Sequence, residues 1–324
     1  MNASAGIGNE RMIEITKYDL SMRPVWDQLV MASRNGTFLH QRGYMDYHSD
    51  RFDDCSLVAS DRGRVVALLP ANRSGDTLWS HQGLTYGGWI LPARHMDGTV
   101  MLEVMNRACE WMVTNGLRHL VYTPVPHIYH RYPAEEDLYA LVNRGARLAE
   151  CNLSTVVDLN APLPIDRGNK AGMNRALRAG VQVGPSDDWE GYWQVLRQVL
   201  EARYGARPVH TLAEMQLLRD RFPDNIGLYT ATLDGETLAG IVTYATHTVL
   251  RCQYIASTEW GRELSALALL SARLRADAVA AGRRWLDFGT SNRDHGRYLN
   301  EGLVQQKSRL GGRGIVFNTY QLDL

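Results

Sequence analysis

The chain of 324 residues is long enough for two domains of ordinary size, each with its own hydrophobic core. Lysine plus arginine total 35 and aspartate plus glutamate total 35, so the formal charge is zero, which argues against a strong non-specific nucleic-acid binder. Hydrophobic residues make up 45% of the sequence, as in ordinary globular proteins, and no apolar run approaches the roughly 20 residues that span a bilayer.

The beginning of the chain and the cysteines predict a cellular compartment. The opening residues, MNASAGIGNERM, lack the basic and apolar regions of a secretory signal. The four cysteines are widely scattered: Cys55, Cys109, Cys151 and Cys252. They form neither a CxxC pair nor a Cys/His spacing that suits zinc. We therefore expect a cytoplasmic protein with reduced thiols, no bound metal and no membrane span.

The first half of the chain alternates short strands with helices. Strands are expected at residues 12–18, 56–60, 64–70 and 119–123, and helices at residues 22–33, 38–48 and 100–115. The turn Asp61-Arg62-Gly63 joins two of the strands into a hairpin, and Gly116 ends the last helix. The pattern predicts a mixed α and β unit.

The second half repeats this order of elements. Strands are expected at residues 148–159, 226–233, 237–246, 249–257 and 285–288, and helices at residues 170–179, 189–204, 212–221 and 264–281. A hairpin, a strand, a helix and a strand thus follow one another in both halves. The sequence predicts an α+β protein of two tandem units, each a mixed, mostly antiparallel sheet flanked by helices. Residues 156–165, with Pro162 and Pro164, are the expected boundary.

Several segments resemble the FemABX-like branch of the acyltransferases that have the GNAT fold. Residues 169–183, NKAGMNRALRAGVQV, look like the basic helix that opens the second domain of these proteins. Residues 234–257, DGETLAGIVTYATHTVLRCQYIAS, are similar to their central hairpin and the next strand. WLDFGTS at residues 285–291 and LNEGLVQQKSRLGG at residues 299–312 resemble their Asp-Phe-Gly turn and closing Lys-Gly-Gly segment. GLTYGGWILP at residues 83–92 is a shorter echo in the first half.

The resemblance implies two GNAT-like domains, a degenerate acceptor-side domain at residues 12–160 and a domain at residues 161–324 that holds the donor and the catalytic site. It implies an enzyme that moves an acyl group from acyl-CoA to an amine of a sugar nucleotide, glycan precursor or peptide, in polysaccharide or cell-wall biosynthesis. A transferase that uses aminoacyl-tRNA and acts on a cell-wall precursor is the alternative. A non-catalytic GNAT-like protein that binds a glycan or a partner is a further one.

The turn that follows residues 249–257 departs from the GNAT pattern. In that pattern a glycine-rich turn and a helix N-terminus hold the pyrophosphate of acyl-CoA. Residues 257–270, STEWGRELSALALL, keep one glycine, Gly261, and add Glu259 and Glu263, whose charge opposes a pyrophosphate. This departure weakens the assignment of acyl-CoA as the donor.

Three side chains are candidates for catalysis. Acyl transfer to an amine needs a proton acceptor and donors aimed at the carbonyl oxygen as it becomes an oxyanion. Lys307 is expected to stabilise that oxyanion or to bind a phosphate, the alternative being a surface lysine. Asp287 either orients a donor or accepts a proton, or it caps its own turn. His210, in the link ARYGARPVH, is the candidate base, the alternative being a solvated loop histidine.

The donor is expected on the strand that separates from its neighbour in the GNAT fold and in the turn after that strand. The residues predicted to bind it are Gln253, Tyr254, Ser257, Thr258, Gly261 and Arg262. Side chains of Gln253 and Tyr254 face opposite sides of the sheet, so at most one of them points into the cleft. A core position with a hydrogen-bonded hydroxyl is the alternative for Tyr254.

The acceptor is expected to contact a second group of residues. Tyr86 resembles a wall of the acceptor groove, and the planar guanidinium of Arg207 suits a phosphate or a carboxylate. Gly289, Ser291 and Asn300 belong to a turn that is too polar for a core and well suited to a site.

Overall fold

The computed structural model describes residues 11–324, and these residues form two compact units. Unit 1 contains residues 11–149 and Thr319–Leu324, and unit 2 contains Glu150–Asn318. The predicted boundary at residues 156–165 lies within unit 2, because residues 156–158 continue strand β8 (Arg147–Asp158) rather than forming a linker. Strand β16 (Arg313–Asp323) carries the end of the chain back into unit 1, which no sequence pattern indicated.

The described residues also bear on the expectations about membranes and thiols. No helix within residues 11–324 is long and apolar enough to cross a membrane. All four cysteines are unbonded thiols, as predicted, with Cys151 exposed and the other three buried. The expectation that the chain begins without a secretory signal rests mostly on residues 1–10. These residues lie outside the described part of the chain.

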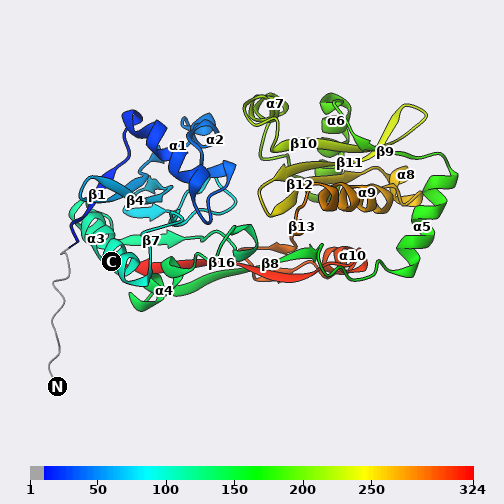
Figure 1. Ribbon diagram of the computed structural model, residues 1–324. Helices are drawn as coiled ribbons and strands as arrows, with labels where there is room; N and C mark the ends of the chain where they lie inside the picture. Colours follow the sequence, from blue (N-terminus) through cyan, green and yellow to red (C-terminus); the bar gives the residue numbers. More distant parts are fainter. Residues whose placement is uncertain (1–10) are drawn as a thin grey trace, which may run out of the picture. The chain divides into compact units, whose positions relative to one another are not determined.

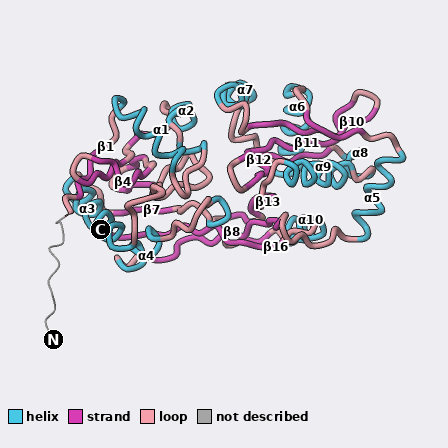
Figure 2. The backbone as a smooth tube through the Cα atoms, in the orientation of Figure 1, coloured by secondary structure: helices cyan, strands magenta, loops and turns pink. Residues whose placement is uncertain are grey.

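Unit 1 combines two sheets with helices (Figures 1 and 2). Its strands are β1 (Ile13–Lys17), β2 (Asp53–Asp54), β3 (Leu57–Asp61), β4 (Arg64–Leu69), β5 (Asn72–Ser74), β6 (Thr77–Trp79) and β7 (His119–Tyr122). Its α-helices are α1 (Arg23–Ala32), α2 (Arg42–Met45), α3 (Gly98–Thr114) and α4 (Glu136–Asn143), with short 3-10 turns η1 (Leu20–Met22), η2 (Phe38–His40), η3 (Asp46–His48) and η4 (His127–Tyr129). One sheet has the order β1-β3-β4, and the other places β2, β5, β6, β7 and the end of β16 side by side.

The hydrophobic core of unit 1 lies between these sheets and helices α3 and α4. Helix α3 turns one apolar stripe toward this core, in which Val100, Val104 and Ala108 recur at spacings of four residues. Asp97 caps the helix by accepting hydrogen bonds from two backbone N–H groups of its first turn. These features confirm the helix predicted at residues 100–115.

Unit 2 contains its own set of sheet strands and helices. Its strands are β8, β9 (Gln182–Pro185), β10 (Ile226–Leu233), β11 (Glu236–Ala245), β12 (Val249–Ser257), β13 (Trp285–Thr290), β14 (Asn292–Arg293), β15 (Tyr298–Leu299) and most of β16. Its helices are α5 (Arg167–Arg178), α6 (Trp189–Tyr204), α7 (Leu212–Arg221), α8 (Glu259–Glu263), α9 (Ala266–Ala280) and α10 (Glu301–Arg309). The strand order is β8-β13-β12-β11-β10-β9, antiparallel except for the pair β12 and β13.

Helices α6 and α9 cover opposite faces of the unit 2 sheet (Figure 1). On β11, Gly240 lies under the Tyr192 ring of α6, where an added Cβ would come within 2.2 Å of the ring, so glycine is required for this close approach. Ile241, the next residue, points the other way into the core that α9 closes with Leu270 and Leu274. The sheet is therefore sandwiched between these two helices.

One predicted helix is interrupted in the structure, and another is confirmed. The helix predicted at residues 264–281 is α9, and Ser265, whose left-handed backbone conformation has φ of 61°, separates it from the short helix α8, which the sequence did not indicate. Residues 38–48 form the short elements η2, α2 and η3 instead of one helix. The remaining predicted strands and helices occur within a few residues of their expected bounds, which agrees with the predicted fold class of tandem mixed units.

His40 is a fully buried histidine that unit 1 holds in its neutral form. Its Nδ1 accepts a hydrogen bond from the Thr37 backbone N–H at 3.0 Å, and its Nε2 lies 3.3 Å from the Tyr86 carbonyl oxygen. Burial lowers the pKa of His40 to about 4, because a charged imidazole would lose its hydration. Protonation would also place a proton on the nitrogen that faces the Thr37 donor.

Acid should therefore weaken unit 1 through His40. Below pH 6.5 the unfolded chain binds a proton there that the folded protein does not bind until about pH 4. The stabilising contribution of His40 is complete above pH 6.5 and decreases by about 1.4 kcal/mol per pH unit toward pH 4. In urea unfolding, His40→Gln should be less stable than the wild type at about pH 7, and the gap should narrow at about pH 5. A gap that stays constant would contradict this assignment.

Candidate functional site

The site of unit 2 begins where two neighbouring strands separate. β12 and β13 pair in parallel only from Val249↔Trp285 to Arg251↔Asp287, although β12 continues to Ser257. On its other edge β12 stays paired with β11, but the register shifts at a β-bulge that leaves Gln253 as the extra residue. Bulges re-aim side chains and bend a strand, and they are frequent beside active sites. The edge of β12 that faces β13 thus has no strand partner beyond Arg251.

A cavity of about 420 Å³ occupies this separation. Its walls come from α5, α6, the end of β12, α8, the start of α9, β13 and α10. Three cationic side chains line it, Arg203, Arg262 and Lys307, and no aspartate or glutamate does. Its size is that of a small-molecule site, and its charge favours an anionic ligand.

The turn after β12 closes one end of the cavity. Thr258 caps α8, because its hydroxyl oxygen accepts a hydrogen bond from the Gly261 backbone N–H at 3.0 Å. Gly261 packs against the Leu238 carbonyl oxygen so closely that a Cβ would lie 2.3 Å from that oxygen. This glycine therefore serves close backbone packing. Glu259 and Glu263, whose charges were expected to oppose a pyrophosphate, are exposed and do not line the cavity.

Lys307 lies on α10 and lines the cavity beside the end of β13. Its ammonium donates hydrogen bonds to the carbonyl oxygens of Gly289 at 2.8 Å and Thr290 at 2.9 Å, and to the hydroxyl of Ser291 at 3.0 Å. The side chain is 5% exposed, and burial lowers the pKa of Lys307 to about 8, while the Asp287 carboxylate opposes that shift. The surface-lysine alternative is therefore wrong. Lys307 holds the turn at residues 289–291 and brings a positive charge to the cavity.

Asp287 does not line the cavity, so the structure does not support its predicted role as a proton acceptor and instead supports the alternative, in which it caps its own turn. Its carboxylate is completely buried and pairs with the Arg251 guanidinium at 2.7 Å. It also accepts hydrogen bonds from the Ser154 hydroxyl and from the Gly289 backbone N–H, each at 2.7 Å. Gly289 has φ of 76°, a conformation that favours glycine. Asp287 therefore positions the turn whose carbonyl groups bind Lys307.

His210 is buried and lies against strand β12. Its Nδ1 and the Tyr254 hydroxyl are 2.6 Å apart, and Tyr254 packs edge-on against the Trp193 ring of α6 with ring centroids 5.6 Å apart. Burial raises the pKa of Tyr254 to about 12, so its hydroxyl stays protonated at neutral pH. The solvated-loop alternative for His210 is wrong. Tyr254 does not line the cavity, so the alternative given for it, a core position with a hydrogen-bonded hydroxyl, is the one that the structure shows.

The structure separates the predicted donor residues into two groups. Ser257, Gly261 and Arg262 line the cavity, and Arg262 is held there because its guanidinium donates to the Ser257 carbonyl oxygen at 2.8 Å. Thr258 shapes the turn through its cap. Gln253 instead accepts a hydrogen bond from Arg251 at 3.3 Å and is outside the cavity lining.

The predicted acceptor residues also differ in their surroundings. Tyr86 is 1% exposed and packs in unit 1 against Tyr129, with ring centroids 4.5 Å apart, so its side chain is a core residue and does not form a groove wall. Asn300 caps α10 through a hydrogen bond from the Leu303 N–H at 3.1 Å. Arg207 is exposed and lines a second cavity of unit 2. Gly289 and Ser291 are the partners of Lys307 described above.

Sequence reasoning missed Arg251 and Ser154, which complete the surroundings of Asp287. Arg251 is two residues before Gln253 on β12, so strand alternation places both on one face, and this was an available signal. Ser154 gave no such signal, because its contact with Asp287 joins segments 133 residues apart. No group of three or more His, Cys, Asp or Glu side chains within residues 11–324 is arranged to hold a metal ion.

Comparison with known proteins identifies a family for part of unit 2 and solved structures with the same fold. Residues 167–297 match the family described as the acetyltransferase (GNAT) domain. No curated protein sequence matches the chain closely enough to count as a relative. The solved structure of FemX is 11% identical with a TM-score of 0.69, and the match covers 96% of this chain and 97% of that chain.

Two further solved structures share the fold. L-PGS from Bacillus licheniformis is 13% identical with a TM-score of 0.55, over 79% of this chain and 81% of that chain. A tandem GNAT protein from the clavulanic acid biosynthesis pathway is 15% identical with a TM-score of 0.50, over 96% of this chain and 98% of that chain. The predicted resemblance to FemABX-like proteins of the GNAT fold is confirmed. Residues 167–297 of unit 2 thus match an acetyltransferase (GNAT) domain, and the chain shares the fold of these solved structures.

Proposed function

We propose that unit 2 transfers an acetyl-type acyl group from acyl-CoA to an amine of a sugar nucleotide, glycan precursor or peptide. The observation that carries this proposal is the cavity at the separation of β12 and β13, with three cationic side chains and no carboxylate in its lining. A CoA donor is anionic at its phosphates and has an extended amide-containing arm that ends in the thioester. The charge of such a ligand suits that cavity, and its extended arm suits the unpaired edge of β12.

The unpaired edge of β12 supplies the first contacts of this proposal. Backbone N–H and C=O groups that have lost a strand partner need another one, and an extended amide chain offers both donors and acceptors. The guanidinium groups of Arg203 and Arg262 would face the phosphates, for which arginine is well suited. The acyl carbonyl would then lie toward the end of the cavity that Lys307 lines.

The proposed reaction is a direct attack within a complex of both substrates. The amine nitrogen forms a bond to the thioester carbonyl carbon, the carbon–sulfur bond breaks, and the CoA thiolate leaves. The positive charge of Lys307 stabilises the negative charge that develops on the carbonyl oxygen. The amine gives up a proton, for which His210 is the proposed acceptor, and Tyr254, protonated at neutral pH, orients the imidazole through its 2.6 Å contact.

One observation favours aminoacyl-tRNA as an alternative donor. Helix α5 carries four exposed cationic side chains and no acidic residue: Arg167, Lys170, Arg175 and Arg178. Its residue Asn169 lines the cavity, so a polyanion bound along α5 would end at the site. Nucleic-acid binding of this kind weakens steeply as salt rises, because released counterions drive it.

Titration calorimetry with acetyl-CoA and with free CoA tests the donor. Saturable binding by the wild type, weakened at least about tenfold in Arg262→Gln, is the expected result, since a charge-assisted contact contributes about 1.5–3 kcal/mol. Absence of acetyl-CoA binding would reject acyl-CoA. Binding of a charged tRNA with a steep salt dependence would then identify the alternative donor.

The pH dependence of turnover should report the charge of Lys307. Because its pKa is lowered to about 8, kcat/KM should fall as the pH rises through about 8 and the ammonium loses its proton. Lys307→Met should lower kcat on the order of a hundredfold or more, as expected for loss of oxyanion stabilisation. Lys307→Arg keeps its charge at high pH, so its residual activity should lack this falling limb. A limb that persists in Lys307→Arg would assign it to another group.

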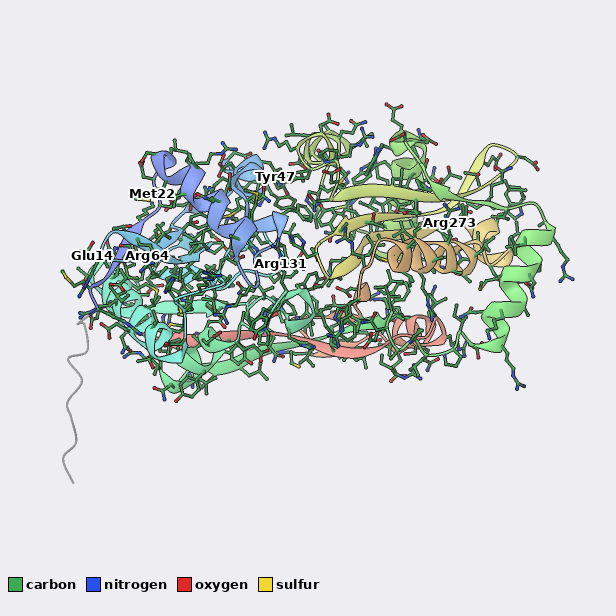
Figure 3. All side chains as sticks on the ribbon, viewed as in Figure 1. Glu14, Met22, Tyr47, Arg64, Arg131 and Arg273 are labelled. Carbon is green, nitrogen blue, oxygen red and sulfur yellow. The ribbon has the colours of Figure 1, made fainter. Side chains whose placement is uncertain are left out.

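Asp287→Asn should reveal the positioning role of that carboxylate. Removing the charge that pairs with Arg251 inside the protein should cost about 3–5 kcal/mol of unfolding free energy. Asp277→Asn is a matched control, since the half-buried Asp277 pairs at 2.9 Å with Arg273, which is exposed, and an ion pair open to solvent contributes about 1 kcal/mol or less. Arg273 is labelled in Figure 3.

The same variant has a second readout that a purely structural residue would lack. Asp287 raises the pKa of Lys307, so its loss should move the falling limb of kcat/KM to lower pH. Equal destabilisation by Asp287→Asn and Asp277→Asn, together with an unmoved limb, would contradict the positioning role.

A further inference from the structure

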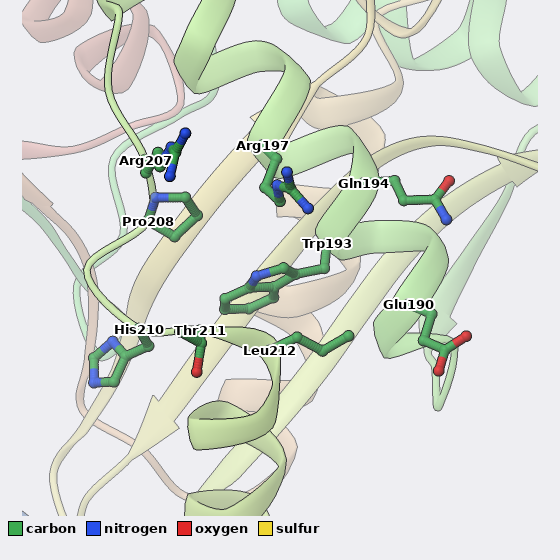
Figure 4. Close-up of a pocket in the computed structure, with 9 residues that line it drawn as sticks. All are labelled: Glu190, Trp193, Gln194, Arg197, Arg207, Pro208, His210, Thr211 and Leu212. Atoms are coloured by element: carbon green, nitrogen blue, oxygen red, sulfur yellow. The ribbon is translucent and has the colours of Figure 1, made fainter.

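A second cavity of unit 2, which we call the α6 cavity, has a volume of about 430 Å³. It lies between the first half of α6 and the link from α6 to α7. Glu190, Trp193, Gln194 and Arg197 line it from α6, at spacings of three and four residues that place them on one helix face. The link contributes Arg207, and Figure 4 shows its side chain and that of Arg197 on the same side of the Trp193 indole.

The two arginines are the charged feature of the α6 cavity. Both are exposed, and neither forms a hydrogen bond or an ion pair with another residue within the described part of the chain. They come from two different elements yet line one cavity. Two planar guanidinium groups beside each other suit a bidentate oxyanion such as a carboxylate or a phosphate.

The rest of the α6 cavity combines apolar side chains with one carboxylate, that of Glu190, and with the polar residues Gln194, His210 and Thr211. The Trp193 ring is 4% exposed and forms the floor, with Pro208 and Leu212 beside it (Figure 4). Glu190 lies at the end opposite the arginines in the same view. A ligand with an oxyanion at one end and an uncharged body over the indole therefore matches this surface.

Helix α6 also lines the cavity between β12 and β13, which we call the donor cavity. Its residues from Glu190 to Arg197 line the α6 cavity, and its residues from Val199 to Arg203 line the donor cavity. Seven residues of offset at about 1.5 Å per residue separate the two sets by on the order of 10 Å along the helix axis, and they also lie on different faces of α6, so the two centres are at least about that far apart. Trp193 and His210 of the α6 cavity also contact Tyr254 of β12, the strand whose end lines the donor cavity.

We infer that the α6 cavity binds the acceptor by an oxyanion, held by Arg197 and Arg207, while the acceptor amine reaches the donor cavity. This inference rests on the proposed function and specifies its acceptor class. The amine and the oxyanion must lie at least about 10 Å apart, which is at least about three residues of an extended peptide at roughly 3.4 Å each. The oxyanion is the carboxylate of a short peptide or the phosphate of a nucleotide-linked sugar, two sources of the same chemistry.

Trialanine, its C-terminal amide and uridine diphosphate are the probes that separate these sources. If a carboxylate is read, calorimetry should show trialanine binding at least about tenfold more tightly than its amide, and if a phosphate is read, the diphosphate should bind instead. In either case Arg197→Gln and Arg207→Gln should each weaken the preferred probe at least about tenfold. Arg64→Gln is the control, because Arg64 (Figure 3) is an exposed arginine of unit 1 with no ion pair that lines neither cavity.

Failure of this inference is distinguishable from failure of the proposed donor. Acetyl-CoA affinity should be the same in wild type, Arg197→Gln and Arg207→Gln, because neither arginine lines the donor cavity. Binding of acetyl-CoA without arginine-dependent binding of any of the three probes would overturn the acceptor site alone. Loss of acetyl-CoA binding in the arginine variants would also overturn it, since the two cavities would then not act separately.

Discussion

The site of unit 2 depends on one buried carboxylate, that of Asp287. Its oxygens hold the Arg251 guanidinium, the Ser154 hydroxyl and the Gly289 N–H, which come from β12, β8 and the end of β13. An unpaired charge at this depth would cost several kcal/mol, so the three donors are required together with the carboxylate. Their joint effect is to fix the direction in which the chain leaves β13, and the carbonyl groups after that point then hold Lys307.

Separation of β12 from β13 follows from the same arrangement. The parallel ladder ends at the pair that contains Asp287, and the chain then turns through Gly289 into the segment that Lys307 binds. β12 continues past this point, through its bulge at Gln253, because β11 still supports its other edge up to Ser257. One strand thus bends away while its neighbour is held in place. The cavity is the space left between them, and the fold provides it before any ligand arrives.

The order of strands and helices was predictable, because hydrophobic periodicity and turn residues are local signals. Lys307 was singled out because its motif resembles one of a known fold, and Ser257, Gly261 and Arg262 because they follow β12; these residues line one cavity. The sequence did not predict the surroundings of single side chains. Tyr86 and Asp287 looked like site residues, yet both are buried by partners far away in the sequence. The short helix α8 was not predicted either, because the left-handed backbone conformation of Ser265 that separates it from α9 leaves no pattern in residues of otherwise good helix propensity.

Electrostatics links the fold of unit 2 to what it can bind. Arg203, Arg262 and Lys307 bring three positive charges to a cavity without a carboxylate in its lining, and only Lys307 has a buried negative group, Asp287, close enough to influence its pKa. Holding like charges together destabilises a folded protein, and an anionic ligand removes that cost when it binds. Part of the affinity for such a ligand is therefore stored in the unliganded site. A neutral ligand of the same size would gain none of it, so the charge of the cavity selects its ligand before shape does.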